Sequence, residues 1–502
     1  MIDRNESTSA NQVDVIIVGA GFAGLAAADA LVQVSQGGKV PSFVILDAAD
    51  RLGGRTLTTP NDLLDLGAGY VGATQLYMQQ MIQRFGLSTF PTYLDSTKNW
   101  LYQKAGGSAP LLLVPGNNPL ALPGGQGSTL WMAQLDAMSL VVAANLSAPW
   151  DTPGAAEMDA ITVKQWAEDL VAKGEMSRET YDLLRVSVRS AFSCELGDIS
   201  FLFFLYYCAS AGSYASLVDV TGGSGAAEGT RFTYGTRSLV DALADAVGRH
   251  HIKTGVAVAT IAQDESGVDV TMADGTTWRG ARVIVAMSPI VSRKIEYQPP
   301  LQALPGGPER VLLCDNMPMG HTIKGFVLYK WPFWRAKGLM GYALSTAENA
   351  QDAPLDWAMD NSWEPTDWDL EKPAPAHRHG MMTFIVGKAA DYWGQQPQEV
   401  RAEAVIKHLE VFYGSMARTE LIDDAPYYVD MDWSKTASLG CPTGVLGPGI
   451  FTKAGPALKR SIGRIHWAGS ESADQWCGYM NGAIQSGVRA ASEVLRALAG
   501  SG

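Results

Sequence analysis

The sequence predicts a mixed α/β fold in which a nucleotide-binding domain is assembled from separated parts of the chain. Near the N-terminus, an apolar strand at 13–18 leads into a glycine-rich turn at 19–24 and an Ala-rich helix at 25–34. Near the C-terminus, an apolar strand at 465–468 leads into a second glycine-rich turn and an Ala-rich helix at about 480–498. Because both patterns are strand, turn and helix, we expect the two turns to contribute to one nucleotide site.

The first turn has the spacing G-x-G-x-x-G. Gly19 allows the tight turn, Gly21 lets the backbone approach a pyrophosphate, and Gly24 lets helix and strand pack closely. A second apolar strand at 43–46 ends in Asp47, near the offset at which an acidic side chain binds a ribose hydroxyl. In this order the elements predict a Rossmann-type dinucleotide-binding domain, although the glycine spacing alone would also fit an ordinary strand–helix turn.

The second turn, at 469–479, directly precedes the last predicted helix. Free backbone N–H groups and the positive end of the helix dipole meet at the start of a helix. Such a point suits an electron-rich ligand edge, such as the pyrimidine carbonyl of a reduced flavin, and a phosphate is the alternative.

Composition narrows the class of protein. A chain of 502 residues can bury more than one core, so two interleaved domains are expected. The formal charge of −13 argues against a nucleic-acid partner, which requires basic surfaces. The N-terminus has no secretory-signal pattern, and the apolar run at 201–209 is short, which predicts a buried helix and not a membrane anchor. Five cysteines without C-x-x-C or histidine spacing indicate no disulfide framework and no metal site. We therefore expect a soluble, cytoplasmic protein.

Two further segments follow the first turn, at 50–56 (Asp-Arg-Leu-Gly-Gly-Arg-Thr) and 65–72 (Asp-Leu-Gly-Ala-Gly-Tyr-Val-Gly). With these segments the sequence resembles the flavin-containing monoamine oxidase family. The similarity covers most of the chain and continues through these stretches: 72–75, 84–87, 191–207, 317–324, 331–334 and 464–491. The resemblance implies FAD as cofactor and the oxidative deamination of amines, with primary amines expected, to an aldehyde, ammonia and H2O2. It also implies a small-molecule amine and O2 as partners, and a homodimer is compatible with it.

The resemblance and the turns together predict the domain boundaries. The FAD-binding domain is expected in three segments, at 11–89, 228–313 and 435–500. The substrate-binding domain is expected at 90–227 and 314–434, and residues 1–10 are predicted to be a flexible terminus.

The middle FAD segment has its own predicted elements. We expect a helix at 238–247, and strands at 251–261, 268–273 and 278–286, with a hairpin turn at Asp274-Gly275. The Gly/Pro-rich stretch at 106–127 is predicted to be a surface excursion.

The resemblance assigns the residues that contact FAD. They are Gly19, Gly21, Gly24, Asp47, Arg51, Gly54, Arg55, Gly67, Ala68, Val258, Cys441, Gly469, Glu471, Gly478, Tyr479 and Met480. In the family, a linking cysteine follows a glycine and precedes an aromatic residue, and Gly440-Cys441-Pro442 resembles that arrangement. This favours a thioether between Cys441 and the flavin's C8 methyl, with Cys477 as the weaker candidate.

Lys324 is the strongest catalytic candidate because it interrupts an apolar strand at 322–328. A buried ammonium is costly unless it has a partner. In the family, the matching lysine holds a water against flavin N5, and a cation there can stabilise the charge that develops as O2 is reduced. The alternative is an edge strand in which Lys324 points to solvent.

The substrate pocket is assigned by the same resemblance. Tyr479 matches one wall of an aromatic pair that flanks the amine, and is the second catalytic candidate. Pro442 matches the other wall, where the family has an aromatic residue, and Trp433 is a candidate replacement. The remaining pocket candidates, each of which could equally be a packing residue, are Tyr70, Leu217, Trp357 and Phe384.

Several rival functions share parts of this pattern. An L-amino-acid oxidase of the same fold would need a cation for the substrate carboxylate, and Arg189 is the candidate. A polyamine oxidase is a second alternative of the same fold. A histone-lysine demethylase would need a basic surface and a partner module. A non-catalytic flavin-binding protein would keep the nucleotide turns without Lys324.

Overall fold

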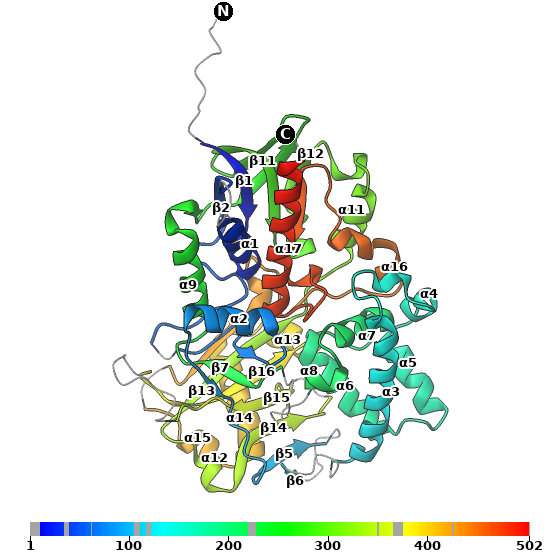
Figure 1. Ribbon diagram of the computed structural model, residues 1–502. Coiled ribbons are helices and arrows are strands. Elements are labelled where there is room, and N and C mark those ends of the chain that lie inside the picture. Colours follow the sequence, from blue (N-terminus) through cyan, green and yellow to red (C-terminus); the bar gives the residue numbers. More distant parts are fainter. Residues whose placement is uncertain are drawn as a thin grey trace, which may run out of the picture. The chain divides into compact units, whose positions relative to one another are not determined.

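The computed structural model describes residues 11–34, 40–61, 63–104, 111–116, 122–218, 227–348, 351–364, 375–423 and 426–500 (Figure 1). The terminus at 1–10, predicted to be flexible, lies outside these residues. The chain divides into two compact units. Unit 1 contains residues 1–54, 239–317 and 453–502, and unit 2 contains residues 55–238 and 318–452. Helices and several sheets occur together, and the predicted mixed α/β class is confirmed.

Unit 1 is built on an eight-stranded sheet with the order β12-β9-β10-β11-β1-β2-β8, and β18 also pairs with β11. Strands β18, β11, β1, β2 and β8 run parallel. The last four residues of β1 and all of β2 and β18 are buried, as expected for apolar strands at the centre of a parallel sheet. The strands are β1 (Gln12–Val18), β2 (Phe43–Leu46), β8 (Ile252–Lys253), β9 (Val258–Gln263), β10 (Val268–Met272), β11 (Thr277–Ala286), β12 (Glu296–Gln298) and β18 (Ile465–Ala468).

Two helices of unit 1 start where parallel strands end. Helix α1 (Phe22–Gln33) follows β1, and α17 (Met480–Ala499) comes after β18 and its glycine-rich turn. They lie side by side, and a Cβ added at Gly487 would lie 2.1 Å from the Ala23 carbonyl oxygen. Only a glycine therefore allows this close approach. Further helices of this unit are α9 (Arg237–Val247), α10 (Pro289–Ser292) and α11 (Gly307–Asp315).

The strand predicted at 251–261 is wrong as a single element. The chain instead forms a short 3-10 turn at Arg249–His251, then β8, and then β9. Gly255, with φ of +86°, turns the backbone between the two strands. As a result β8 pairs with β2, whereas β9 pairs with β10 and β12 on the other side of the sheet. The hairpin turn at Asp274-Gly275 is confirmed, because β10 and β11 pair antiparallel around Gly275.

Unit 2 is built on a seven-stranded sheet with the order β17-β13-β16-β15-β14-β5-β6. Strand β13 has a neighbour on each side and is buried at all eight positions. A separate three-stranded sheet has the order β3-β7-β4. The strands are β3 (Tyr70–Val71), β4 (Thr89–Pro91), β5 (Asn99–Gln103), β6 (Leu112–Pro115), β7 (Thr230–Phe232), β13 (Thr322–Tyr329), β14 (Leu339–Ser345), β15 (Trp357–Asp360), β16 (His379–Val386) and β17 (Tyr428–Asp432).

The two faces of the seven-stranded sheet bury different side chains. On one face, Ile323 and Val327 pack with residues of α14 (Gln398–Tyr413). The opposite face belongs to a second core, with Phe326 and aromatic residues of β14, β15 and β5. Lys324 lies on this second face, because side chains alternate along a strand.

The remaining helices of unit 2 include a short, fully buried one. All ten residues of α7 (Phe201–Ser210) are buried, which confirms the predicted buried helix. Other helices of the unit are α2 (Leu76–Phe85), α3 (Gly125–Ala143), α4 (Ala155–Asp159), α5 (Val163–Ala172), α6 (Arg178–Phe192), α8 (Tyr214–Val218), α12 (Phe333–Ala336), α13 (Lys388–Trp393) and α15 (Met416–Thr419).

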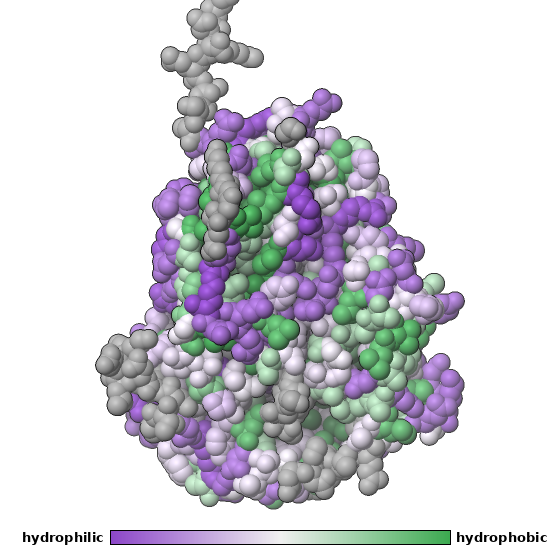
Figure 2. Space-filling view, viewed as in Figure 1, coloured by the Kyte–Doolittle hydropathy of each residue, from purple (hydrophilic) through white to green (hydrophobic). Residues whose placement is uncertain are grey.

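The stretch predicted as a surface excursion at 106–127 contains an edge strand and the start of a helix where the chain is described. Residues 112–115 form β6, which pairs antiparallel with β5, and α3 begins at Gly125. Residues 105–110 and 117–121 lie outside the described part. None of the described helices combines the length and apolar character that a bilayer span requires. Figure 2 shows hydrophilic side chains over much of the visible face, with hydrophobic ones in small groups.

Candidate active site

The first glycine turn contains glycines with two different roles. A Cβ at Gly19 would lie 2.6 Å from the Ala286 carbonyl oxygen, and one at Gly24 would lie 1.8 Å from the carbonyl oxygen of Gly19. Contacts within the protein therefore require glycine at both positions. Gly21 differs, because an added Cβ would meet no protein atom closer than 3.8 Å. The space beside Gly21 is thus open, as it must be if a pyrophosphate is to approach the backbone.

Asp47 lies at the carboxyl end of β2, beside this turn. Its carboxylate accepts hydrogen bonds from the backbone N–H groups of Ala20 at 2.5 Å and Ala49 at 2.8 Å. Burial raises the pKa of Asp47, and these two N–H donors oppose that rise. Each carboxylate oxygen can accept another hydrogen bond, so a ribose hydroxyl remains chemically acceptable here.

Residues 253–255 lie beside Asp47. The Asp47 N–H donates to the Lys253 carbonyl, and the Gly255 N–H donates to the Ala49 carbonyl, both at 2.8 Å. Val258, the predicted contact, lies further along in β9 and pairs with Met272. Val258 stays a predicted contact, and residues 253–255 are the neighbours of Asp47 that the structure adds.

Arg51 holds the next part of the site in unit 1. Its guanidinium donates to the Gly54 carbonyl at 2.8 Å, and the Gly53 N–H donates to the Ala20 carbonyl at 3.0 Å. The Arg51 bond therefore closes the loop at 51–54, and the Gly53 bond holds this loop against the first glycine turn.

The second turn ends at the start of α17. Tyr479 is the N-cap residue, and its side chain makes no capping hydrogen bond. The Tyr479 side chain therefore does not occupy the first N–H groups of α17, and the start of a helix suits an anionic or electron-rich acceptor. The half-buried ring of Tyr479 packs edge-on against Trp476, with 5.0 Å between centroids. Gly469 has φ of +140°, a value that favours glycine, and Glu471 is buried beside Ser470.

Lys324 lies in unit 2 on β13, an interior strand next to the edge strand β17. It pairs with Phe384 of β16 on one side and with Met431 of β17 on the other. Its side chain is buried, and its Nζ donates to the Gly67 carbonyl at 2.8 Å. The alternative of a solvent-facing lysine on an edge strand is therefore wrong.

The surroundings of Lys324 combine burial with negative charge. Burial lowers the pKa of Lys324 to about 8, while Asp65, Cys441 and Glu228 act to raise it. Asp65 is itself held by the hydroxyls of Thr58 and Thr236, at 2.6 and 2.9 Å. The ammonium is thus poised to change its charge slightly above neutral pH, which is unusual for lysine.

Aromatic side chains surround the same ammonium. The rings of Tyr70, Phe326 and Phe384 have their centroids 5.5–5.6 Å from Nζ. Phe384 in turn stacks on Trp357 at 4.4 Å and 11°. Register explains this arrangement, because Lys324, Phe384 and Trp357 are directly opposite one another on β13, β16 and β15.

We call this set of side chains the lysine face: Lys324, Phe326, Met382, Phe384, Trp357, Tyr342 and Tyr70. Three predicted pocket residues, Tyr70, Trp357 and Phe384, belong to it. The fourth, Leu217, lies in α8 and is partly buried.

A set of hydrogen bonds fixes the segment 66–68 and the cysteine loop in the same unit. Trp433 donates to the Leu66 carbonyl at 2.8 Å, and Arg55 donates to the Pro442 carbonyl at 2.8 Å. The Ala68 N–H donates to the Arg55 carbonyl at 3.2 Å. Trp433 is buried, and its possible part as a replacement for the aromatic wall missing at Pro442 stays a prediction.

Comparisons with known proteins agree with this geometry. Residues 22–495 match the family described as flavin containing amine oxidoreductase. The chain belongs to this family. It is 31% identical to the probable flavin-containing monoamine oxidase A of Dictyostelium discoideum, over 96% of this chain and 97% of that protein. It is 33% identical to the putative flavin-containing monoamine oxidase AofH of Mycobacterium tuberculosis, over 96% of both.

Solved structures of flavin amine oxidases have the same fold. Cyclohexylamine oxidase from Brevibacterium oxydans matches with a TM-score of 0.83 and 28% identity, over 97% of this chain and 99% of that chain. A redesigned putrescine oxidase matches with a TM-score of 0.82 and 25% identity, over the same shares. The predicted family, the FAD cofactor and the enzyme class of amine oxidase are thereby confirmed.

The residues present fit FAD. The open space at Gly21 and the start of the long helix α17 directly after a glycine-rich turn are features that a dinucleotide would use, and both lie in unit 1. FAD supplies the redox chemistry, taking two electrons from the amine and passing them to O2. The predicted contacts in unit 1 are Gly19, Gly21, Gly24, Asp47, Arg51, Gly54, Val258, Gly469, Glu471, Gly478, Tyr479 and Met480. Those in unit 2 are Arg55, Gly67, Ala68 and Cys441.

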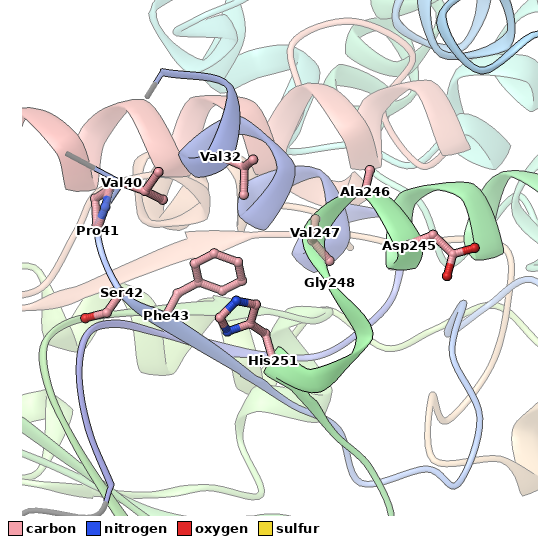
Figure 3. A pocket seen from close by; sticks show the side chains of 10 residues that line it. All are labelled: Val32, Val40, Pro41, Ser42, Phe43, Asp245, Ala246, Val247, Gly248 and His251. Atoms are coloured by element: carbon pink, nitrogen blue, oxygen red, sulfur yellow. The ribbon is translucent and has the colours of Figure 1, made fainter. Parts of the chain in front are cut away.

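A surface groove in unit 1 lies elsewhere (Figure 3). It has a volume of about 440 Å³, and Phe43 and His251 point into it, with rings 4.4 Å apart. Phe43 is the first residue of β2, whereas nucleotides bind at the carboxyl ends of such strands. We therefore assign this groove no part in the FAD site.

Proposed function

We propose that the chain oxidises primary amines that carry no carboxylate beside the amino group. The lysine face carries this proposal, because it offers aromatic and apolar side chains around one cation. An alkyl or aryl amine can bury its apolar part against such a face. A substrate carboxylate would need a further cation.

The two arginines that could serve a carboxylate are already engaged. Arg189 is buried and donates to Asp356 and to the Val386 carbonyl, both at 2.9 Å. Arg231 donates to the Ser362 carbonyl at 2.9 Å, and its guanidinium lies over the ring of Phe90. Recruiting either one would leave a buried acceptor without its donor, which costs about 1–3 kcal/mol. This favours an amine over an amino acid.

Names of the related structures point the same way. Cyclohexylamine oxidase is named for an apolar monoamine, and putrescine oxidase for a diamine. We infer that the substrates of this chain belong to the same broad class of aliphatic and aromatic amines.

Lys324 and Tyr479 have the central roles in the proposal. The Lys324 ammonium is held in place by the Gly67 carbonyl and stabilises the negative charge that develops as O2 is reduced. We do not assign Lys324 as the base that deprotonates the amine. From the resemblance, we assign Tyr479 as a residue that flanks the amine, and Pro442 as a position at which the chain lacks the family's aromatic side chain.

We also propose that FAD is attached covalently through Cys441. In support, Cys441 acts electrostatically on Lys324, and its loop is held by the bond from Arg55 and by the Cys441 N–H donating to the Gly320 carbonyl at 3.0 Å. The thioether would replace one hydrogen of the flavin's C8 methyl and the thiol hydrogen, and O2 would accept the two electrons released. Cys477 is fully buried in unit 1 and stays the weaker candidate.

A peroxide-coupled assay with matched pairs tests the substrate proposal. Each pair consists of an amine and its α-carboxylated counterpart, such as phenylethylamine and phenylalanine. We expect H2O2 from the amines and at least a hundredfold lower kcat/KM for the amino acids. Preference for the amino acids would overturn the proposal and indicate that Arg189 is recruited. A cytoplasmic location and a homodimer stay predictions from the sequence.

A further inference from the structure

His321 lies between two carboxylates directly before β13, and none of the roles above uses it. Its Nδ1 is 2.8 Å from an Asp391 oxygen, and its Nε2 is 3.1 Å from an Asp432 oxygen. Asp391 belongs to α13 and Asp432 is the last residue of β17, so the ring joins three elements of unit 2. We call these three residues the histidine clamp.

The two contacts determine the charge of the ring. Carboxylates are ionised at neutral pH and then only accept hydrogen bonds. A neutral imidazole has one N–H donor, so only the imidazolium can donate to both Asp391 and Asp432. Burial lowers the pKa of His321, but the two carboxylates outweigh burial and raise it above 6.5. Burial raises the pKa of Asp432, yet the hydrogen bonds from His321 and Ser434 bring it down to about 2.

The other charged groups on the surrounding elements are either paired within unit 2 or exposed to water. They are Lys388, Glu195, Lys435, Asp430 and Arg401. Lys435 lies 3.5 Å from the second Asp432 oxygen, and Arg401 pairs with Asp430 at 2.7 Å. Among all these groups, only a histidine ordinarily changes its charge near neutral pH.

The backbone next to the histidine clamp holds the cysteine loop, residues 440–443. The Gly320 carbonyl accepts a hydrogen bond from the Cys441 N–H at 3.0 Å, and the Gly320 N–H donates to the Thr443 carbonyl at 3.1 Å. The two segments are in close contact, since a Cβ at Gly440 would lie 2.4 Å from the Gly320 carbonyl oxygen. A displacement of the clamp would therefore also displace the loop.

Asp432 connects the histidine clamp to two further parts of the site. It pairs with Ile323, the residue before Lys324, so the clamp closes the end of the strand pair that contains Lys324. Trp433 follows Asp432 and donates at 2.8 Å to the carbonyl of Leu66, which directly precedes two predicted FAD contacts.

We propose that His321, as an imidazolium between Asp391 and Asp432, is a positioning residue for the parts of the flavin site that lie in unit 2. Those parts are the cysteine loop, Lys324 and the segment 66–68. When the ring loses its proton, one N–H remains for two carboxylates, so one of the two bonds is lost. The inference goes beyond the proposed substrate class and does not require a covalent bond to the flavin.

Nuclear magnetic resonance of the holoenzyme, with isotope-labelled histidine side chains, tests the clamp itself. The chain has seven histidines, and the His321 resonance is the one that His321→Gln removes. We expect it to titrate above pH 6.5 in the wild type and at lower pH in Asp391→Asn, because a nearby opposite charge favours the charged form. Asp169→Asn, at an exposed position of α5, is the control and should leave the titration unchanged. Titration at or below pH 6.5, or no shift in Asp391→Asn, would overturn the inference.

Visible circular dichroism of the bound oxidised flavin supplies a readout that a merely structural role would not move. In the wild type this signal should change with the same midpoint as the His321 resonance. The midpoint should move to lower pH in Asp391→Asn, and the transition should be absent in His321→Gln. It should persist in Lys324→Met, which separates it from the titration of Lys324 near pH 8. A flavin signal that does not follow the charge of His321 would overturn the positioning role.

Discussion

Replacing Lys324 by methionine removes the ammonium at similar length and should separate the two halves of the catalytic cycle. The side chain is 4% exposed, so its charge acts in a poorly solvated environment. Removing one preorganised group that stabilises developing negative charge typically lowers a rate by about 10²–10³-fold. We expect the reaction of reduced enzyme with O2 to slow by about a hundredfold, and reduction by amine to change by less than about tenfold.

The variant should remain folded because two effects on stability oppose each other. The Gly67 carbonyl loses its donor, which costs about 1–3 kcal/mol. Burial of the ammonium also ends, and a pKa lowered from 10.5 to about 8 corresponds to about 3 kcal/mol. In the wild type, this cost of burying the charge is fully present below pH 8, where Lys324 is protonated in both the folded and the unfolded state. It shrinks as pH rises toward 10.5, because the folded protein releases the proton at a lower pH than the unfolded chain does. Near neutral pH the two effects should nearly cancel.

Stopped-flow absorbance of the flavin measures both half-reactions. In the wild type, the rate with O2 should fall as pH rises through about 8, where Lys324 loses its proton, and in Lys324→Met it should be flat. Lys173→Met, at an exposed position, is the control. If both half-reactions of Lys324→Met matched the wild type, the ammonium would have only a structural role.

Four further substitutions test three separate parts of the site. Gly21→Ala should leave thermal stability unchanged, since its Cβ meets no protein atom within 3.8 Å, but it should lower the FAD content of the purified protein at least tenfold. Gly24→Ala should instead prevent folding. Equal FAD content in Gly21→Ala and wild type would refute the argument that the space beside Gly21 is open for the cofactor. Cys441→Ala should release all flavin into the supernatant on acid precipitation, whereas wild-type flavin should stay with the pellet; free wild-type flavin would refute the covalent bond. Pro442→Tyr should lower the kcat/KM ratio of bulky to small amines about tenfold, and an unchanged ratio would exclude Pro442 as a pocket wall.

Local patterns were sufficient to predict the nucleotide-binding elements. A strand, a G-x-G-x-x-G turn and a helix follow each other directly, so each glycine could be given a role before any contact was known. Even so, the sequence alone does not show that contacts within the protein require glycine at positions 19 and 24, whereas the space beside Gly21 is free of protein atoms.

Lys324 shows where sequence reasoning stops. An apolar strand with one lysine is compatible with an edge or a central position, and only pairing with residues 384 and 431 decides between them. The stack of Phe384 on Trp357 likewise depends on register between strands that are distant in the sequence.

Anaerobic addition of a primary amine to the purified protein tests the central claim most directly. The protein should be yellow, with the absorbance of oxidised flavin, and the amine should bleach that absorbance before any O2 is admitted. Admission of O2 should restore the colour and yield H2O2. A colourless protein that gains nothing from added FAD, or a flavin that no amine bleaches, would contradict the assignment as a flavin-dependent amine oxidase.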